Sequence, residues 1–295
     1  MARVIPTGAP DFTYTGNYTQ EWRDDWGWVI RFKTSGTLTF TKRQRIDLFL
    51  MGGGGGGAGG SNPAGGGGGG AGYATTVKKL TASAGQEYEI VVGAGGSGSG
   101  NGHNNGGTGG TSSAFGYSAN GGGGGKGVWN GAGGGGGAGS AKGGGTALES
   151  GNTSYNGSAS SVYEFEDTSF TRLGGGGGGG ATSSGWYGTG GAPYGATGNG
   201  VDAADNTGAG GSGGQAASNG TGGPGGDGGS GIVCIRNTEV TELPVRFNGR
   251  TPTQIFFNGA LVEHLVVDGT EIFMERLRGW LGWLKRQTRF VLRAA

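Results

Sequence analysis

IDLFLMGGGGGGAGG, residues 46–60, decides the fold, because an apolar strand runs here directly into uninterrupted glycine. The same junction recurs as YEIVVGAGG at residues 88–96, and a mirrored version, GGSGIVCIR, ends the glycine-rich region at residues 228–236. Short apolar runs bounded by glycine predict β-strands. We therefore expect strands and glycine blocks to be parts of one domain, with glycine segments projecting from the ends of sheet strands.

Glycine supplies 81 of the 295 residues, whereas proline supplies seven. Collagen needs glycine at every third position with abundant proline, so uninterrupted blocks such as 52–57 and 174–180 exclude it. Disorder is the stronger alternative, because ordering glycine costs backbone entropy and buries no side chain. The seven Trp, nine Tyr and twelve Phe residues, together with the strand-like runs, indicate a folded core instead.

Glycine blocks that return repeatedly to strands favour packed polyglycine II helices over flexible linkers. Helices of this type have three residues per turn and no internal hydrogen bonds, so neighbouring helices must supply the partners of their N–H and C=O groups. Only glycine fits inside such a bundle, which explains why the interruptions are mostly Ala, Ser and Thr. Flexible Gly/Ser linkers are the alternative interpretation.

Before the first glycine block, residues 11–51 show three strand-like runs with a plausible turn at Ser35-Gly36. The spacing predicts a small antiparallel sheet, with Arg31, Thr39 and Asp47 on its solvent side. The apolar positions of the three runs are Trp28, Ile30 and Phe32; Leu38 and Phe40; and Ile46, Leu48 and Leu50.

After Arg236 a ten-residue repeat begins: VRFNGRTPTQ, IFFNGALVEH, LVVDGTEIF. Its turn pairs are the strongest short signal for β-hairpins, because both central residues must accept positive φ. The pairs are Asn248-Gly249, Asn258-Gly259 and Asp268-Gly269. From Glu271 onward, apolar residues near heptad spacing and many cations predict an amphipathic helix, which Gly279 and Gly282 weaken.

This helix has three interpretations: an oligomerisation or docking helix, a helix packed on its own chain, and a membrane-surface helix. We favour the first. Its candidate docking residues are Leu277, Trp280, Leu281, Trp283 and Leu284.

The expected fold is thus mainly β, an antiparallel β-sandwich-like sheet with inserted packed polyglycine II helices, then short β-hairpin repeats and a C-terminal α-helix. Four parts follow from the composition: an N-terminal strand segment of the glycine-rich domain at 1–51, a glycine-rich polyglycine II region with interspersed strands at 52–236, hairpin repeats at 237–270 and the basic helix at 271–295.

Charge and cysteine content exclude several classes of function. A net charge of +1 provides no field to gather nucleic acid, and a single cysteine, Cys234, cannot form an intrachain disulfide. The N-terminal residues lack the apolar stretch of a signal peptide, and no apolar run is long enough for a membrane span. We therefore expect synthesis in a reducing cytoplasm and no nucleic-acid partner.

Catalytic and metal-binding motifs are missing from the sequence. Only His103, His264 and Cys234 could join carboxylates at such a site, and neither histidine lies in a motif. Matches to G-x-G-x-x-G reflect composition, since no βαβ context follows them. Residues 222–227 match the start of a calcium β-roll repeat only once, and Glu164, Glu166 and Asp167 are better explained as a solvated strand edge than as a paired-acid site. We expect no catalytic residue, metal or cofactor.

Aromatic side chains scattered among the glycines are candidates for binding, because rigid rings give contact area at low entropic cost. The alternative is that they pack against the glycine bundle. The candidate receptor-binding residues are Trp129, Trp186, Tyr187 and Tyr194.

The chain resembles the glycine-rich domain proteins found among tail fibre, adhesin and minor tail proteins of phages and prophages. The matching pieces lie within residues 1–236 and are PTGAPDFTYTGNY, WVIRFKTSGTLTFTK, IDLFLMGGGGGGAGG, YEIVVGAGGSG and GGPGGDGGSGIVCIR. The resemblance implies a virion component, made in the host cytoplasm and located in the tail, whose polyglycine II helices display loops toward a bacterial surface receptor, a glycan or an outer surface protein.

The resemblance also implies that other tail proteins and further copies of the chain, commonly three, are its partners. Two other functions are kept as alternatives: a purely structural virion or surface-filament protein without a receptor, and a glycan-degrading enzyme. The basic C-terminal helix departs from the family pattern.

Overall fold

The computed structural model describes residues 9–23, 26–61, 64–100, 102, 104–127, 162–177, 198–216 and 222–238. Beyond these it describes the backbone of four short strands at 256–257, 260–261, 264–267 and 270–273.

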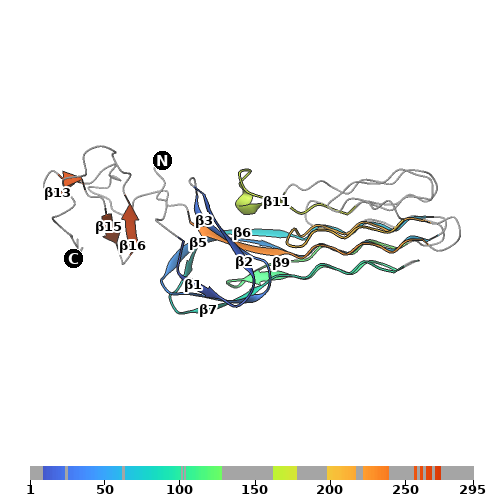
Figure 1. Ribbon diagram of the computed structural model, residues 1–295, viewed down its shortest axis with the longest axis horizontal. Coiled ribbons are helices and arrows are strands. Elements are labelled where there is room, and N and C mark those ends of the chain that lie inside the picture. Colours follow the sequence, from blue (N-terminus) through green and yellow to red (C-terminus); the bar gives the residue numbers. More distant parts are fainter. Residues whose placement is uncertain are drawn as a thin grey trace.

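Two five-stranded antiparallel sheets form the body of the described protein (Figure 1). Sheet A has the order β1 (Phe12–Tyr14), β4 (Gly36–Phe40), β7 (Glu87–Val91), β8 (Ser112–Ala114) and β9 (Tyr117–Ala119). Sheet B has the order β2 (Tyr18–Arg23), β3 (Gly27–Phe32), β12 (Ile232–Asn237), β5 (Gln44–Met51) and β6 (Ala74–Ala82). The prediction of a mainly β fold is confirmed.

The two sheets face each other across one hydrophobic core. Alternate residues of β3, β5 and β12 point into it, and all of them are buried: Trp28, Ile30, Phe32, Ile46, Leu48, Leu50, Val233 and Ile235. Sheet A contributes Leu38, Phe40 and Ile90 to the same core. Strict alternation places apolar side chains on one face of a strand, so these sequences specify the sandwich directly.

The outer face of sheet B is buried as well along its three inner strands. The intervening residues Val29, Phe49 and Cys234 pack there against Phe165 and Phe170, which lie in a covering segment made of β10 (Val162–Tyr163), the 3₁₀ helix η1 (Glu164–Glu166) and β11 (Arg172–Leu173). Burial on both faces explains why β3, β5 and β12 read as continuous apolar runs.

One prediction about strand pairing is wrong. The three strands of residues 11–51 were expected to form one small sheet with a turn at Ser35-Gly36, but β3 and β4 belong to different sheets. β3 pairs with β2 and β12, while β4 pairs with β1 and β7. Residues 33–35 therefore carry the chain across the sandwich instead of forming a hairpin.

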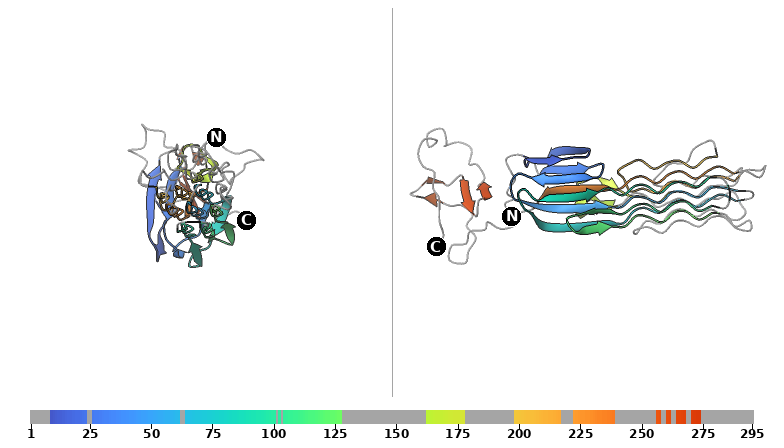
Figure 2. Two further views of the ribbon diagram at one scale, coloured as in Figure 1. Left: turned by 90° about the vertical axis from the view of Figure 1, so that its right-hand side faces the viewer. Right: turned by 90° about the horizontal axis from the view of Figure 1, so that it is seen from below.

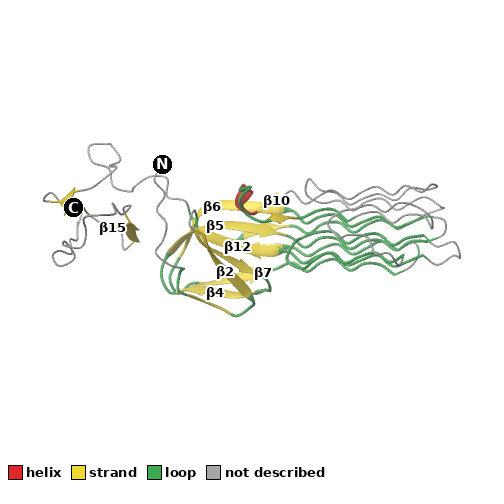
Figure 3. Cartoon of the chain, turned by 45° about the horizontal axis from the view of Figure 1, so that its top comes forward, coloured by secondary structure: helices red, strands yellow, loops and turns green. Residues whose placement is uncertain are grey.

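Glycine segments extend from one end of the sandwich as a bundle (Figures 1 and 3). The segments that run outward include 52–61 from β5, 92–100 from β7, 120–127 from β9, 174–177 from β11 and 208–216. Those that return include 64–73 to β6, 104–111 to β8, 198–204 and 222–231 to β12. Strands and glycine segments are thus one structure, as the junction at 46–60 predicted (Figure 2).

Segment 52–61, the central segment, is hydrogen-bonded to six described neighbours. Its N–H groups donate to segments of opposite direction and change partner at every residue, namely Gly55 to Gly70 (2.8 Å), Gly56 to Gly107 (2.9 Å) and Gly57 to Gly226 (2.8 Å). Its carbonyls accept from segments of the same direction, namely Gly53 from Gly122 (2.8 Å), Gly54 from Gly96 (2.8 Å) and Gly55 from Gly211 (2.9 Å). Each partner segment returns every third residue, so the backbone groups of this buried segment are satisfied from all sides.

Short strands follow the glycine-rich region. β13 (Phe256–Phe257) pairs with β14 (Ala260–Leu261), and β15 (His264–Val267) pairs with β16 (Thr270–Phe273). These pairs flank Asn258-Gly259 and Asp268-Gly269 as the repeat predicted, whereas Asn248-Gly249 lies outside the described residues. β16 includes residues 271–273, the start of the segment for which a helix was expected, and residues 274–295 are not described.

Candidate functional site

Around Gly52–Gly57 the interior of the glycine bundle has no room for side chains. A Cβ atom added at any of Gly52–Gly57 would lie 1.9–2.1 Å from a carbonyl oxygen of a neighbouring segment. Carbon and oxygen in van der Waals contact are more than 3 Å apart, so any other residue would force the segments apart. Side chains that recognise a ligand are therefore restricted to the ends of the bundle and to its outer surface.

The end of the bundle remote from the sandwich is fixed by short polar contacts. Ser61 donates its N–H to the carbonyl of Ala64 at 2.9 Å, which closes the first outward and return pair. The Ser99 hydroxyl accepts the N–H of Gly59 at 2.6 Å and donates to the Asn104 carbonyl at 2.8 Å. These bonds position the points at which the chain turns, so loops that begin there start from a fixed base.

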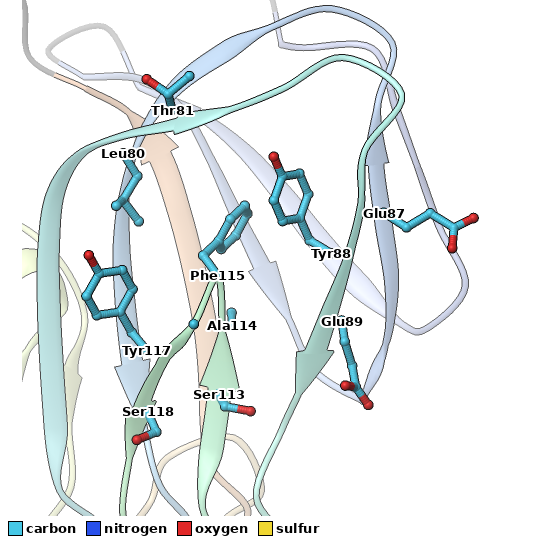
Figure 4. Close-up of a pocket in the computed structure, with 11 residues that line it drawn as sticks. Leu80, Thr81, Glu87, Tyr88, Glu89, Ser113, Ala114, Phe115, Tyr117 and Ser118 are labelled. Atoms are coloured by element: carbon cyan, nitrogen blue, oxygen red, sulfur yellow. The ribbon is translucent and has the colours of Figure 1, made fainter.

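A second candidate site lies on the sandwich, where a groove of about 560 Å³ opens between β6 and β7 (Figure 4). The β8–β9 hairpin reaches only part of the way along β6, which leaves Leu80 facing the groove together with Phe115 and Tyr117. The Phe115 ring lies 4.5 Å from that of Tyr88, and Tyr117 is 41% exposed. Aromatic walls of this kind suit the flat face of a sugar ring or an apolar side chain.

The turn beside the groove is strained. Phe115 and Gly116 both have positive φ, 52° and 79°, as a type I′ turn requires. A bulky residue rarely occupies this region, where Asn or Gly is usual. Phe115 and Tyr117 were among the scattered aromatics of the sequence, whereas Tyr88 gave no signal beyond its place in a strand.

Buried charges hold the covering segment on sheet B. Arg31 donates to both carboxylate oxygens of Glu164, at 2.7 and 2.9 Å, and to Glu21 at 2.6 Å. Glu164 is fully buried, so the interpretation of the acidic residues as a solvated strand edge is wrong for this residue. Burial alone would lower the pKa of Arg31. The hydrogen bond to Glu164 and its negative charge together outweigh this effect, so the pKa of Arg31 lies above its usual value.

Asp47 and Arg236 form a second buried pair, with 3.3 Å between Nε and Oδ2. The Arg236 guanidinium also lies 3.3 Å from the centre of the Trp26 ring, and Asp47 accepts the Thr238 hydroxyl at 2.7 Å. The prediction that Arg31 and Asp47 face solvent is therefore corrected: both lie on the outer face of sheet B, but the covering segment and the end of β12 bury them.

The Cys234 thiol lies 3.5 Å from Glu164. Burial raises the pKa of this thiol well above its usual value, and the negative charge of Glu164 adds to the effect. A protonated, buried thiol is a poor nucleophile, so the charged cluster supports a packing role rather than catalysis.

A family model described as glycine-rich domain matches residues 33–238, more than two thirds of the chain. The chain belongs to the glycine-rich domain family. No curated protein matches it. The matched region of the glycine-rich domain begins directly after β3, although β3 is a central strand of sheet B and β1 and β2 complete the two edges. The folded unit of this glycine-rich domain protein therefore includes at least residues 12–32 in addition to the match.

The predicted binding residues of the glycine-rich domain protein fall outside the described structure. This applies to the receptor-binding candidates Trp129, Trp186, Tyr187 and Tyr194 and to the docking candidates Leu277, Trp280, Leu281, Trp283 and Leu284. Their described neighbours are informative nevertheless. Gly127 donates its N–H to the Asn105 side-chain carbonyl (2.8 Å), and the Gly198 carbonyl accepts the N–H of Gln215 (2.9 Å), so the last described residue before Trp129 and the first one after Tyr194 are both bonded to glycine-rich segments of the bundle.

Within the described parts of the glycine-rich domain protein, no group of three or more His, Cys, Asp or Glu residues is arranged to hold a metal ion. At the calcium-like stretch 222–227, the Asp227 carboxylate accepts the N–H of Gly98 at 2.6 Å and so links two glycine segments. No helix among the described residues is long and apolar enough to cross a membrane.

Proposed function

We propose that this glycine-rich domain protein is a non-enzymatic structural component of a phage virion, a tail fibre or tail tip attachment protein that displays loops for recognition of the host surface. The proposal rests mainly on one observation: six glycine segments surround the central segment and are hydrogen-bonded to it, and the chain turns from the central segment into the first returning segment at the end remote from the sandwich. The phage context rests on the sequence resemblance at residues 1–236.

We infer that the glycine segments are polyglycine II helices packed side by side. The support is the change of hydrogen-bond partner at each residue and its return at every third, because a helix with three residues per turn presents successive N–H groups about 120° apart. Segments of both directions take part, as expected for a chain that repeatedly turns back. Fibre diffraction or solid-state NMR of the isolated protein would test the helix type.

Such a bundle suits the display of variable loops. Its central segment is held mainly by backbone-to-backbone hydrogen bonds, so loop sequences at the remote end can change without altering these bonds. Loops held on a fixed base lose less entropy when they bind a receptor. Trp129, Trp186, Tyr187 and Tyr194 are the residues we assign to this recognition, with a surface glycan or outer surface protein as the receptor.

The direction of the strands supports a proposal for the end that faces the particle. β1 runs toward the glycine bundle and β12 runs away from it, so Ala9 and Thr238 both lie at the end of the sandwich opposite the bundle. We propose that this end docks onto other tail proteins, with Leu277, Trp280, Leu281, Trp283 and Leu284 in the contact, that copies associate in the tail, with three favoured, and that no cofactor or nucleic acid takes part.

The test compares virions that carry variants of the chain. Replacing Trp186, Tyr187 and Tyr194 together by Ser should abolish adsorption to host cells while the melting temperature of the purified protein stays unchanged. Tyr73→Ser is the matched control, since Tyr73 is 42% exposed but lies at the junction with the sandwich, and it should adsorb normally. Normal adsorption of the triple variant would leave a purely structural role, and release of sugars from host envelope polysaccharide would indicate a glycan-degrading enzyme.

A further inference from the structure

In the part of the chain that the structure describes, the outer strand β2 is an edge of sheet B without a second partner strand. Sheet edges in natural proteins are normally short, bulged or guarded by charge, because an open edge pairs with other strands. β1 and β9 are short, three residues each, and β6 carries a bulge at Lys78 and Lys79, where Lys79 has a φ of 62° and donates its N–H to Asp47. β2 has six residues in uninterrupted register with β3 and no such protection.

The charged residues of β2 do not guard its edge. Glu21 lies 2.6 Å from Arg31, and Arg23 donates to the Ser169 carbonyl at 2.9 Å while lying 4.5 Å from the centre of the Phe170 ring. Both side chains are thus directed onto the outer face of their own sheet. Among the described strands, only β3 pairs with β2.

The free backbone groups of β2 can be assigned by alternation. The Lys33 N–H donates to the Asn17 carbonyl at 2.8 Å, so these two opposite residues take the position of a hydrogen-bonded pair, although the Asn17 N–H donates to the Thr34 hydroxyl. In an antiparallel ladder such pairs alternate with pairs whose N–H and C=O groups point away from each other. The N–H and C=O groups of Tyr18, Gln20 and Trp22 therefore point to the outer edge.

The side chains of the same three residues are also incompletely covered. They lie on the core face of sheet B, opposite Phe32, Ile30 and Trp28, but sheet A ends at the short strand β1, which contacts Tyr18 and covers it only in part. Tyr18 is 44% exposed and Trp22 is 45% exposed. Tyr18 continues a series of ring contacts that starts in the core, with its ring centre 5.1 Å from that of Phe12.

We propose that a second copy of this chain pairs antiparallel with β2 about a two-fold axis at Gln20, which joins the two copies of sheet B into one continuous sheet. In this register Tyr18 lies opposite Trp22 of the partner subunit, and the two Gln20 residues face each other. All outward N–H and C=O groups of the three residues then form ladder bonds. Moving the axis by one residue would place two Glu21 carboxylates opposite each other, which opposes that register.

The inference does not depend on the proposed virion function. It gives two copies of the chain in place of the three that the resemblance implies, because an isologous contact closes at two copies. In a hydrogen-bonded antiparallel pair the Cα atoms are about 5.5 Å apart, within the range of a disulfide. Gln20→Cys should therefore give a reducible dimer of the full-length chain on a non-reducing gel. Thr81→Cys is the matched control, since Thr81 is an exposed residue of the other edge strand, β6. This variant should form no disulfide between chains and should run at the mass of one chain on the same gel.

Sedimentation of the full-length protein completes the test. The wild type should have the mass of a dimer, and Gln20→Lys, which places two ammonium groups across the axis, should shift it to the monomer mass while the chain stays folded and melts cooperatively. Thr81→Lys should remain dimeric. A wild type that sediments as a monomer or a trimer, or Gln20→Cys chains that fail to cross-link, would overturn the inference.

Discussion

Arg31 and Glu164 form a bidentate ion pair across 133 residues of sequence, with bonds of 2.7 and 2.9 Å that fasten the covering segment to sheet B. The Glu164 side chain is fully buried and that of Arg31 is 15% exposed. Removing the Glu164 charge leaves the largely buried Arg31 guanidinium with the exposed carboxylate of Glu21 as its remaining ion-pair partner.

Glu164→Gln should therefore lower the free energy of unfolding by about 3 kcal/mol. Chemical denaturation of the purified protein measures this value. Glu166→Gln is the control, because Glu166 is exposed, and it should change stability by less than about 0.5 kcal/mol. Equal stabilities of the two variants would contradict the structural role of the pair.

A single methyl group inside the bundle should have a large effect. The Cβ atom of Gly55→Ala would lie 2.0 Å from the Gly123 carbonyl oxygen, whereas that of Gly100→Ala has no atom within 4 Å. We expect Gly55→Ala to destabilise the protein by about 3 kcal/mol, and Gly100→Ala to be neutral or slightly stabilising. Melting temperatures measured side by side would decide, and a neutral Gly55→Ala would be incompatible with the packed bundle.

Alkaline pH should weaken the fold through Tyr14. Burial raises the pKa of Tyr14 from 10.0 to about 12, and its hydroxyl donates to the Thr34 carbonyl. Because the folded-state pKa is the higher one, the stabilising contribution is complete below pH 10 and is lost as the pH rises toward 12. Denaturation curves across this range should show a smaller loss of stability in Tyr14→Phe than in the wild type, while the exposed Tyr117→Phe should behave like the wild type.

The Cys234 thiol should resist alkylation in the folded protein, because it is buried and its pKa is raised by that burial and by Glu164. Treatment with iodoacetamide followed by mass spectrometry should show no adduct at neutral pH. In denaturant the same reagent should add once, since the sequence contains one cysteine. An adduct formed under native conditions would show that the covering segment opens.

The strands that enter the glycine segments were predictable because their information is local. Ile46, Leu48 and Leu50 alternate toward the core, and Met51 is followed at once by glycine, so both the strand and its continuation could be read from one stretch. Sheet assignment was not local. Residues Ser35 and Gly36 fit a hairpin turn as well as the observed crossing, and only the later strands β7 and β12 decide which sheet each neighbour joins.

The buried charges and the groove likewise depend on residues far away in the sequence, so local patterns could not predict them. Asp47 and Arg31 occupy the polar positions of alternating strands, and nothing near them in sequence indicates that residues 162–173 cover that face. The predicted receptor and docking residues lie outside the described structure, so they remain predictions. The groove beside Phe115 exists because the β8–β9 hairpin is shorter than β6. No residue type in the sequence predicts this difference in length.

The bundle also determines how the protein would carry mechanical force. Its segments are joined sideways by backbone bonds such as Gly55 to Gly70 and Gly57 to Gly226, and these bonds run across the long axis. A force applied between the remote end and the sandwich would act on many of these hydrogen bonds at once in shear, rather than break them one after another. The glycine-rich domain is therefore built to resist tension along its length with no covalent cross-link between its segments.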